Sequence, residues 1–138
     1  MKVVIIGTGN TATVLGRLIK QSGHSIIQVC GRRADATRLL AESLDAAYVT
    51  SINDIDPDGD LYLLAVSDNA LATVAGQFSF PSKLLVHTAG SVSIDILKKA
   101  SKNYGVLYPL QSLRKEVESL PVIPFLVDGN TSDDLTLL

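Results

Sequence analysis

The residues that follow the first apolar run constrain the fold more than any other part of this sequence. Val3–Ile6 is a short apolar run, and positions 7–12 then read Gly-Thr-Gly-Asn-Thr-Ala, the pattern G-x-G-x-x-A. Apolar residues recur at helical spacing over the next segment, from Thr11 to Ser22. A buried strand, a glycine-rich turn and an amphipathic helix in this order are typical of the first βα unit of a dinucleotide-binding fold.

Each position of this turn has a physical role in such a site. Gly7 permits the tight passage from strand to helix, Gly9 lacks a Cβ and lets a pyrophosphate approach the backbone, and Ala12 lets the helix pack closely on the strand. The helix N-terminus adds free N–H groups and the positive end of its dipole. The turn therefore predicts a dinucleotide site. A tight turn without a ligand is one alternative, and a site for another nucleotide or for S-adenosylmethionine is a second.

The end of the second predicted strand, Ser25–Cys30, indicates which dinucleotide is bound. Sites for NAD usually place an acidic residue about 20 positions beyond the glycines, where it binds the ribose 2′-OH. Here Gly31 is followed by Arg32 and Arg33, and the first acidic residue is Asp35. A guanidinium can bind a 2′-phosphate through two parallel hydrogen bonds, so the sequence favours NADP as cofactor over NAD. Alternatively, both arginines are solvated or stack on the adenine without selecting the phosphate.

The rest of the chain alternates short apolar runs with helical patterns, which predicts an α/β fold with helices on both faces of a mostly parallel sheet. We expect a Rossmann-type, doubly wound α/β/α sandwich with strand order 3-2-1-4-5-6. An extra edge strand is expected near Val122–Val127, where Pro124 disfavours a central position. The other expected strands are Val3–Ile6, Ser25–Cys30, Ala47–Val49, Leu61–Val66, Leu84–His87 and Tyr104–Leu107, and helices are expected over 11–22, 35–44, 69–77 and 93–99.

The 138 residues suffice for one domain. We expect residues 1–131 to form an NADP-binding domain and residues 132–138 to begin a helix that continues in a longer protein. Ser132 is a good N-cap, and the leucines after it start an apolar pattern that six residues cannot stabilise alone. A natural frayed tail is the alternative.

Charge and composition exclude several function classes. The formal charge is −2 and no Lys/Arg cluster offsets it, which argues against a nucleic-acid partner. A single cysteine excludes a disulfide framework and a cysteine-built zinc site, and no metal is expected. The opening apolar run is too short for a signal peptide or a membrane helix, so no membrane partner and a cytoplasmic location are expected.

Candidates for the rest of the site follow the fourth and fifth strands, because ligands of open α/β sheets lie outside the carboxyl ends of the strands. The small residues Ala65, Val66 and Ser67 would let the cofactor ribose or nicotinamide lie against the backbone, although Ser67 is equally well explained as a helix cap. His87 is a candidate acid–base group. The alternative for His87 is a buried ring hydrogen-bonded to backbone.

Weaker candidates follow the fifth and sixth strands. Ser91 is a modest candidate for a hydrogen bond to substrate or cofactor. Gln111 is a candidate to face the cleft, or it merely satisfies loop backbone. His24 and Cys30 are interpreted as structural, because His24 lies at the opposite end of the sheet and no base accompanies the cysteine.

Five segments carry a resemblance to a known family: KVVIIGTGNTATVLGRLI, VCGRRADA, LYLLAVSDNAL, LLVHTAGSVSIDIL and GVLYPLQSL. Together they resemble a Rossmann-like family of NADP-dependent oxidoreductases with a domain of unknown function, similar to pyrroline-5-carboxylate reductase and the 6-phosphogluconate-dehydrogenase-like group. The resemblance covers most of residues 1–129. Its specific part is the combination of A-V-x-D, H-T-x-G and P-L-Q-S after successive strands.

The resemblance implies a C-terminal helical domain beyond this segment that forms a homodimer and closes the active site. One departure from the family pattern is Tyr108, a position where family members often have a histidine. The resemblance also implies places for site residues: Gly7, Gly9, Asn10, Thr11 and Ala12 at the pyrophosphate, Arg32 and Arg33 at the 2′-phosphate, Ala65, Val66 and Ser67 along the ribose and nicotinamide, and His87 and Gly90 toward the reacting end. Thr8 and Gly31 are further cofactor-binding candidates, and Gly90 is a weak substrate candidate together with Ser91 and Gln111.

These observations predict the cofactor-binding half of an NADP(H)-dependent oxidoreductase. Hydride would pass between the nicotinamide and a small substrate with a C=O or C=N bond. The domain is expected to bind cofactor better than it turns over substrate. The alternatives are a dinucleotide-sensing module and an NADP-binding protein without catalysis.

Overall fold

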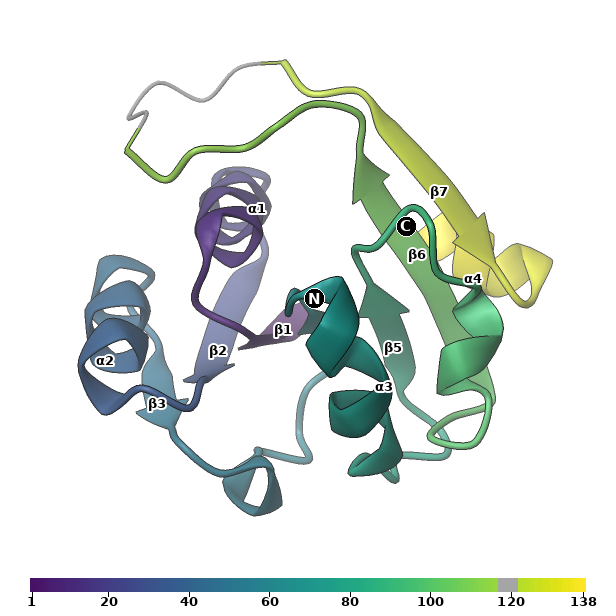
Figure 1. The fold of residues 1–138 in the computed structure, drawn as a ribbon, viewed down its shortest axis with the longest axis horizontal. Helices are drawn as coiled ribbons and strands as arrows, with labels where there is room; N and C mark the ends of the chain where they lie inside the picture. Colours follow the sequence, from purple (N-terminus) through teal and green to yellow (C-terminus); the bar gives the residue numbers. More distant parts are fainter. Residues whose placement is uncertain (117–121) are drawn as a thin grey trace.

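A computed structural model of the chain, which describes residues 1–116 and 122–138, has one seven-stranded sheet with helices on both faces (Figure 1). The strand order is β3-β2-β1-β4-β5-β6-β7. Neighbours from β3 to β6 are parallel, and β7 is antiparallel to β6. The strands are β1 (Lys2–Ile6), β2 (Ser25–Cys30), β3 (Ala47–Val49), β4 (Leu61–Leu64), β5 (Leu84–His87), β6 (Asn103–Pro109) and β7 (Phe125–Gly129).

This order confirms the predicted Rossmann-type α/β class, including the extra strand at the edge. The α-helices are α1 (Asn10–Gln21), α2 (Ala34–Ser43), α3 (Asp68–Gly76) and α4 (Ser132–Leu137). Two 3-10 helices, η1 (Ile52–Asp54) and η2 (Ile94–Leu97), complete the described elements.

The sheet separates two apolar cores, and β1 shows how the sequence builds both. Val3 and Ile5 point to the face covered by α1 and α2, whereas Val4 and Ile6 point to the face covered by α3 and η2. All four side chains are at most 3% exposed. A central parallel strand is buried on both faces, which explains why it reads as a continuous apolar run rather than an alternating one.

Four local expectations need correction. The pattern from Ser93 gives the short 3-10 helix η2 rather than a longer helix. The Ser93 side chain accepts a hydrogen bond from the Asp95 N–H, and the two isoleucines of η2 are poor helix formers.

Three strands have other bounds than expected. Strand β4 ends at Leu64 rather than Val66, because the chain after Leu64 packs against the glycine turn. The edge strand β7 begins only after Pro124, which has no N–H to give to the ladder. The sixth strand is longer than expected and runs from Asn103 to Pro109.

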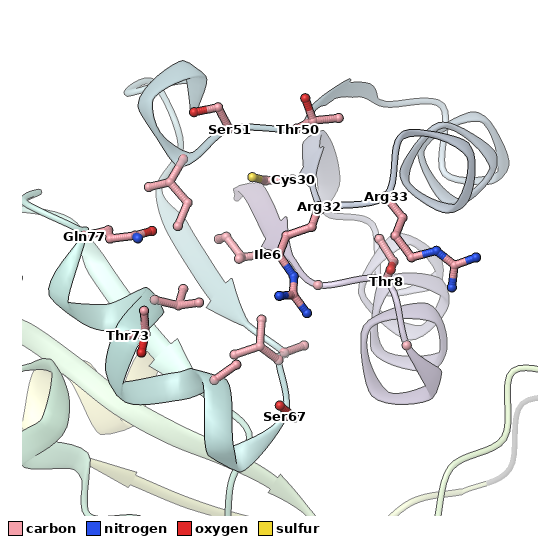
Figure 2. Close-up of a pocket in the computed structure, with 18 residues that line it drawn as sticks. Ile6, Thr8, Cys30, Arg32, Arg33, Thr50, Ser51, Ser67, Thr73 and Gln77 are labelled. Atoms are coloured by element: carbon pink, nitrogen blue, oxygen red, sulfur yellow. The ribbon is translucent and has the colours of Figure 1, made fainter.

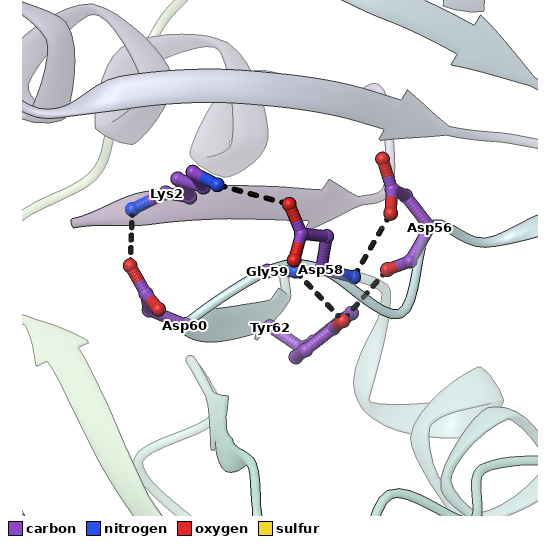
Figure 3. Close-up of polar contacts among 6 residues, drawn as sticks. All are labelled: Lys2, Asp56, Asp58, Gly59, Asp60 and Tyr62. Atoms are coloured by element: carbon purple, nitrogen blue, oxygen red, sulfur yellow. Dashed lines mark hydrogen bonds and ion pairs between the residues drawn. The ribbon is translucent and has the colours of Figure 1, made fainter.

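The loop before β4 is tied to β1 at the amino ends of the strands (Figure 3). The backbone N–H of Lys2 donates to Asp60 Oδ2 at 2.7 Å, and its Nζ pairs with Asp58 Oδ2 at 2.9 Å. The buried Tyr62 hydroxyl accepts from the Gly59 N–H at 3.1 Å and donates to the Asp56 carbonyl at 2.6 Å. These contacts close the end of the sheet opposite the candidate site.

Candidate functional site

A cleft of about 680 Å³ opens at the carboxyl ends of β1, β2 and β4, between α1 and α3 (Figure 2). The side chains that line it come from the glycine turn, from the ends of β2, β3 and β4, and from one face of α3. No acidic residue is among the described residues of the lining. The lining residues are Ile6, Gly7, Thr8, Gly9, Cys30, Gly31, Arg32, Arg33, Thr50, Ser51, Ile52, Ala65, Val66, Ser67, Ala70, Thr73, Val74 and Gln77.

Gly7 holds the turn at the floor of this cleft. Its φ of +119° is one that residues with a side chain rarely adopt, and its N–H donates to the Cys30 carbonyl at 2.9 Å. A Cβ at this position would lie 2.2 Å from the carbonyl oxygen of Ala65. Glycine is therefore required here by the protein itself, because the chain after β1 passes directly against the chain after β4.

No contact with a described residue requires a glycine at position 9. Gly9 is the N-cap residue of α1, its φ is −81°, and a Cβ built on it would meet no atom of residues 1–116 or 122–138 within 4 Å. The position nevertheless lines the cleft, and the N–H groups of the first turn of α1 have no partner within the helix. Open space in front of free N–H donors at a helix N-terminus suits an anionic group such as a pyrophosphate.

The rest of the turn is divided between the cleft and the protein interior. Thr8 lines the cleft, and its methyl group packs against Gly31. A Cβ added to Gly31 would lie 2.6 Å from the Thr8 methyl carbon. Ala12 is fully buried in the core beneath α1. Asn10 and Thr11 do not belong to the lining, and the Asn10 side chain accepts a hydrogen bond from the distant Lys115 N–H at 3.2 Å.

The two arginines after β2 point in different directions (Figure 2). Both are exposed and both line the cleft, but the guanidinium of Arg32 projects into it, whereas that of Arg33 projects away past Thr8. Arg33 is also the N-cap residue of α2, where its carbonyl accepts from Thr37. Neither arginine forms an ion pair with another described residue.

The wall opposite the glycine turn contains residues that sequence reasoning missed. Four residues of α3 or its C-cap face the cleft, at the spacing i, i+3, i+4 and i+7, which is one face of a helix: Ala70, Thr73, Val74 and Gln77. This spacing is visible in the sequence, but Ala70 and Val74 are apolar, and the same spacing is equally typical of residues buried in the core. Thr50, Ser51 and Ile52 follow β3 and line the same wall, as the end of a third parallel strand should. The expected Ala65, Val66 and Ser67 lie between this wall and the turn.

His87 lies at the end of β5 but is fully buried. Its Nδ1 accepts from the Ala89 N–H at 3.0 Å, and its Nε2 faces the Ser93 carbonyl at 3.3 Å. Burial lowers the pKa of the ring below its ordinary value of 6.5, although the backbone contact with Ser93 works in the other direction. In this geometry the ring is neutral and both of its nitrogens are engaged with backbone.

The residues expected toward the reacting end form a second group outside the lining of the cleft. The Tyr108 ring lies flat against Gly90, where a Cβ would come within 2.6 Å of the ring. Ser91 Oγ donates to Asp68 Oδ2 at 3.4 Å, which links the loop after β5 to the first turn of α3. Gln111 is exposed on the segment after β6.

The surroundings of His24 and Cys30 agree with the structural roles expected for them. His24 Nδ1 lies 3.0 Å from the N-terminal amine at the far end of the sheet. Cys30 is 3% exposed at the inner edge of the cleft, and desolvation raises the pKa of its thiol. No group of three or more His, Cys, Asp or Glu side chains within 1–116 and 122–138 is arranged to hold a metal ion.

Comparison with solved structures places this arrangement among known proteins. A candidate NADP oxidoreductase from Bacteroides fragilis matches at 32% identity and a TM-score of 0.90, over 98% of this chain and 54% of the other. The 1-pyrroline-5-carboxylate reductase of Streptococcus pyogenes matches at 21% identity and a TM-score of 0.75, over 99% and 52%. An imine reductase from a Pseudomonas species matches at 16% and 0.63, over 80% and 41%. The chain thus spans about half the length of these proteins.

The sheet order and the position of the cleft define a Rossmann-type domain with a cleft where this fold binds nucleotides. The chain belongs to the family of NADP oxidoreductases described as coenzyme F420-dependent, whose model matches residues 2–91. This agrees with the family resemblance seen in the sequence. A search of curated protein sequences gave no significant match. No helix among the described residues is long and apolar enough to cross a membrane.

Proposed function

We propose that the chain is the NADP(H)-binding half of an oxidoreductase that transfers hydride to or from a small substrate with a C=O or C=N bond. The observation that carries the proposal is the composition of the cleft. A glycine turn with open space and free N–H donors forms one side, and an arginine reaches in from the other. The 1-pyrroline-5-carboxylate reductase and the imine reductase among the structural matches are named for compounds with a C=N bond, which suits the same substrate class.

The lining supports NADP over NAD. A carboxylate after the second strand would bind a ribose 2′-OH but would repel a 2′-phosphate, and no described residue of the lining is acidic. The Arg32 guanidinium projects into that end of the cleft and forms no ion pair with any residue of 1–116 or 122–138. A guanidinium free of other partners keeps its donors for a phosphate.

When bound, the nicotinamide ring would supply the hydride chemistry, and the residues of this chain would supply binding and orientation. The glycine turn and the first turn of α1 would hold the pyrophosphate. The small residues Ala65, Val66 and Ser67 would let the cofactor lie against the backbone after β4. Residues for the substrate itself would come from the group around Gly90 and Ser91, together with parts of a longer protein.

Titration calorimetry with NADP⁺ and NAD⁺ in parallel tests the proposal, with Arg32→Ala and Arg33→Ala as a matched pair. We expect the unaltered chain to bind NADP⁺ at least about tenfold more tightly than NAD⁺, a difference of about 1.4 kcal/mol. Arg32→Ala should remove most of this preference, because its side chain projects into the cleft. Arg33→Ala should have the smaller effect.

The two dinucleotides also separate the roles that an arginine can have here. If Arg32 only stacks on the adenine, Arg32→Ala will weaken NADP⁺ and NAD⁺ equally, and the phosphate assignment is then wrong. If the unaltered chain binds neither dinucleotide, the proposed function itself fails for this chain.

A dinucleotide-binding module without turnover is the second candidate, and the geometry of His87 favours it specifically. The one histidine at the carboxyl end of the sheet is buried and has both ring nitrogens engaged with backbone, so it offers no acid–base group to a substrate. A screen for NADPH oxidation with small carbonyl compounds, imines and coenzyme F420 separates the two. Turnover with any of them supports the enzyme, and tight NADP⁺ binding without turnover supports the module.

A further inference from the structure

The segment that follows β6 is fastened to the helix that carries the glycine turn. We call residues 110–116 the strap, and Figure 1 shows this part of the chain passing across α1. Its Leu113 is 9% exposed and belongs to the core on the α1 side of the sheet. The Lys115 N–H donates to Asn10 Oδ1 at 3.2 Å, and the Lys115 carbonyl accepts from Arg17 Nη1 at 3.0 Å.

These contacts are specific because they join both polar backbone groups of one residue in an irregular segment to one face of a helix. Lys115 lies in a turn outside the described strands and helices, and two side chains of α1 bond both polar backbone groups of that residue. Asn10 and Arg17 are two helical turns apart and therefore lie on the same face of α1. The strap lies along that face.

Asn10 is also the residue directly after Gly9, at the N-terminal end of α1. A backbone N–H can only donate, so the hydrogen bond with Lys115 fixes which way the Asn10 amide faces. The carboxamide oxygen is turned toward the strap, and the NH₂ group with its two donors is turned away from it. Family resemblance gives Asn10 a part in holding the pyrophosphate, whereas in this structure the side-chain oxygen holds the strap.

We propose that Asn10 is a positioning residue that fastens the strap beside the glycine turn, and that docking of the strap and binding of the dinucleotide favour each other. This rests on the proposed function. The docked strap carries two exposed cationic residues, Arg114 and Lys115, and one exposed acidic residue, Glu116, so it brings a net positive charge next to the end of α1 where the phosphates would be bound. Cations at this place attract a dianionic pyrophosphate, and any such coupling is reciprocal by thermodynamic linkage.

Trypsin reports directly on the strap, because it cleaves after Arg114 and Lys115. The first bond contains the N–H held by Asn10, and the second contains the carbonyl held by Arg17. A docked strap resists cleavage, since a protease needs a released segment. We expect saturating NADP⁺ to slow cleavage at these two bonds at least about fivefold, while cleavage after the exposed Lys98 and Lys99 is unchanged. Equal slowing at all sites, or none at the strap, would overturn the coupling.

Two single variants and their combination test whether the coupling runs through the strap. Arg17→Ala removes a strap contact two turns away from the glycine turn, where it cannot touch a phosphate. We expect Arg17→Ala and Asn10→Ala each to raise the NADP⁺ Kd about three- to tenfold, with the double variant little worse than Asn10→Ala alone. Asn10→Asp keeps an acceptor for the Lys115 N–H, so it should restore trypsin resistance of the cofactor-free chain that Asn10→Ala has lost.

The possible results separate the explanations. If Asn10→Ala weakens NADP⁺ binding and Arg17→Ala does not, Asn10 is a direct phosphate ligand and the positioning role is wrong. If both variants lose trypsin resistance but bind NADP⁺ normally, the strap contacts are only structural, and the coupling is again wrong. If the unaltered chain binds no dinucleotide, the proposed function fails and the coupling fails with it. Thermal unfolding of each variant shows that it is folded before binding is compared.

Discussion

At the scale of single residues, the two glycines of the turn have separate reasons to be glycine. Gly7 has a φ of +119° and lies against a backbone carbonyl, whereas Gly9 has an ordinary backbone conformation and faces open space in the cleft. The first residue therefore serves the fold. The second is free to serve a ligand.

Alanine at each position should separate these roles. Gly7→Ala should lower the free energy of unfolding by at least about 2 kcal/mol, because the new Cβ is both strained and in contact with the Ala65 carbonyl. Gly9→Ala should lower it by no more than about 1 kcal/mol, because alanine is a poorer N-cap than glycine but meets no steric clash here. It should nevertheless weaken NADP⁺ binding at least about tenfold, since the Cβ occupies the approach to the backbone. Denaturant unfolding and calorimetry on the same samples measure both, and normal NADP⁺ binding by a folded Gly9→Ala chain would contradict the assignment.

His87 makes stability depend on pH. The buried ring has a pKa below 6.5, so between that lowered value and 6.5 the unfolded chain binds a proton that the folded chain does not. The contribution of His87 to the free energy of unfolding is therefore highest above about pH 6.5. It decreases as the pH falls from 6.5 toward the lowered pKa of His87. His87→Asn keeps an acceptor for the Ala89 N–H but cannot be protonated.

The free energy of unfolding should therefore fall less steeply below pH 6.5 in His87→Asn than in the unaltered chain. Denaturant titrations at several pH values measure the two slopes, with the exposed His24→Asn as control. Parallel curves for His87→Asn and the unaltered chain would show that the buried ring does not titrate as its environment indicates.

At the scale of elements, the loop before β4 depends on one buried hydroxyl more than on its charges. The Tyr62 ring stacks on Phe80 at a centroid distance of 4.8 Å, and its hydroxyl bonds two backbone groups of the loop. Tyr62→Phe keeps the ring but leaves the Gly59 N–H and the Asp56 carbonyl without this partner. The expected loss is about 1–3 kcal/mol in the free energy of unfolding.

Lys2→Met is the matched comparison for this loop. It removes the exposed ion pair with Asp58 but keeps the backbone hydrogen bond to Asp60. Its effect on the free energy of unfolding should be small and should disappear in high salt, because exposed ion pairs are screened. A larger loss for Lys2→Met than for Tyr62→Phe would contradict this ranking.

Elements with a strong apolar period were predictable, and those fixed by local chemistry were less so. β2, β3 and β5 have the residues that the sequence indicated, and α1 and α2 each begin one residue early. Leu40 in α2 and Leu44 at its C-cap are buried, but Leu39 is 61% exposed, because the helix turns only one side to the sheet. Position in the helix decides burial, and apolar character alone does not.

At the scale of the whole molecule, the sheet order followed from the alternation of strands and helices together with the glycine turn. Right-handed crossovers between parallel strands leave few arrangements, and the observed order is the one expected. The position of a ligand cleft at the carboxyl ends of the strands follows from the same rule. The sequence thus sufficed for the fold class and for half of the cleft.

Only the tertiary structure revealed the remaining wall and the strap. Thr73 and Gln77 become lining residues because one face of α3 forms a wall of the cleft, and that placement depends on how α3 packs on β4 and β5. The contact between Asn10 and Lys115 joins residues 105 positions apart through one hydrogen bond. Periodicity determines an element and which side it buries, since both are local properties of the chain. Contacts between distant segments are decided by packing of the complete molecule, which no local pattern encodes.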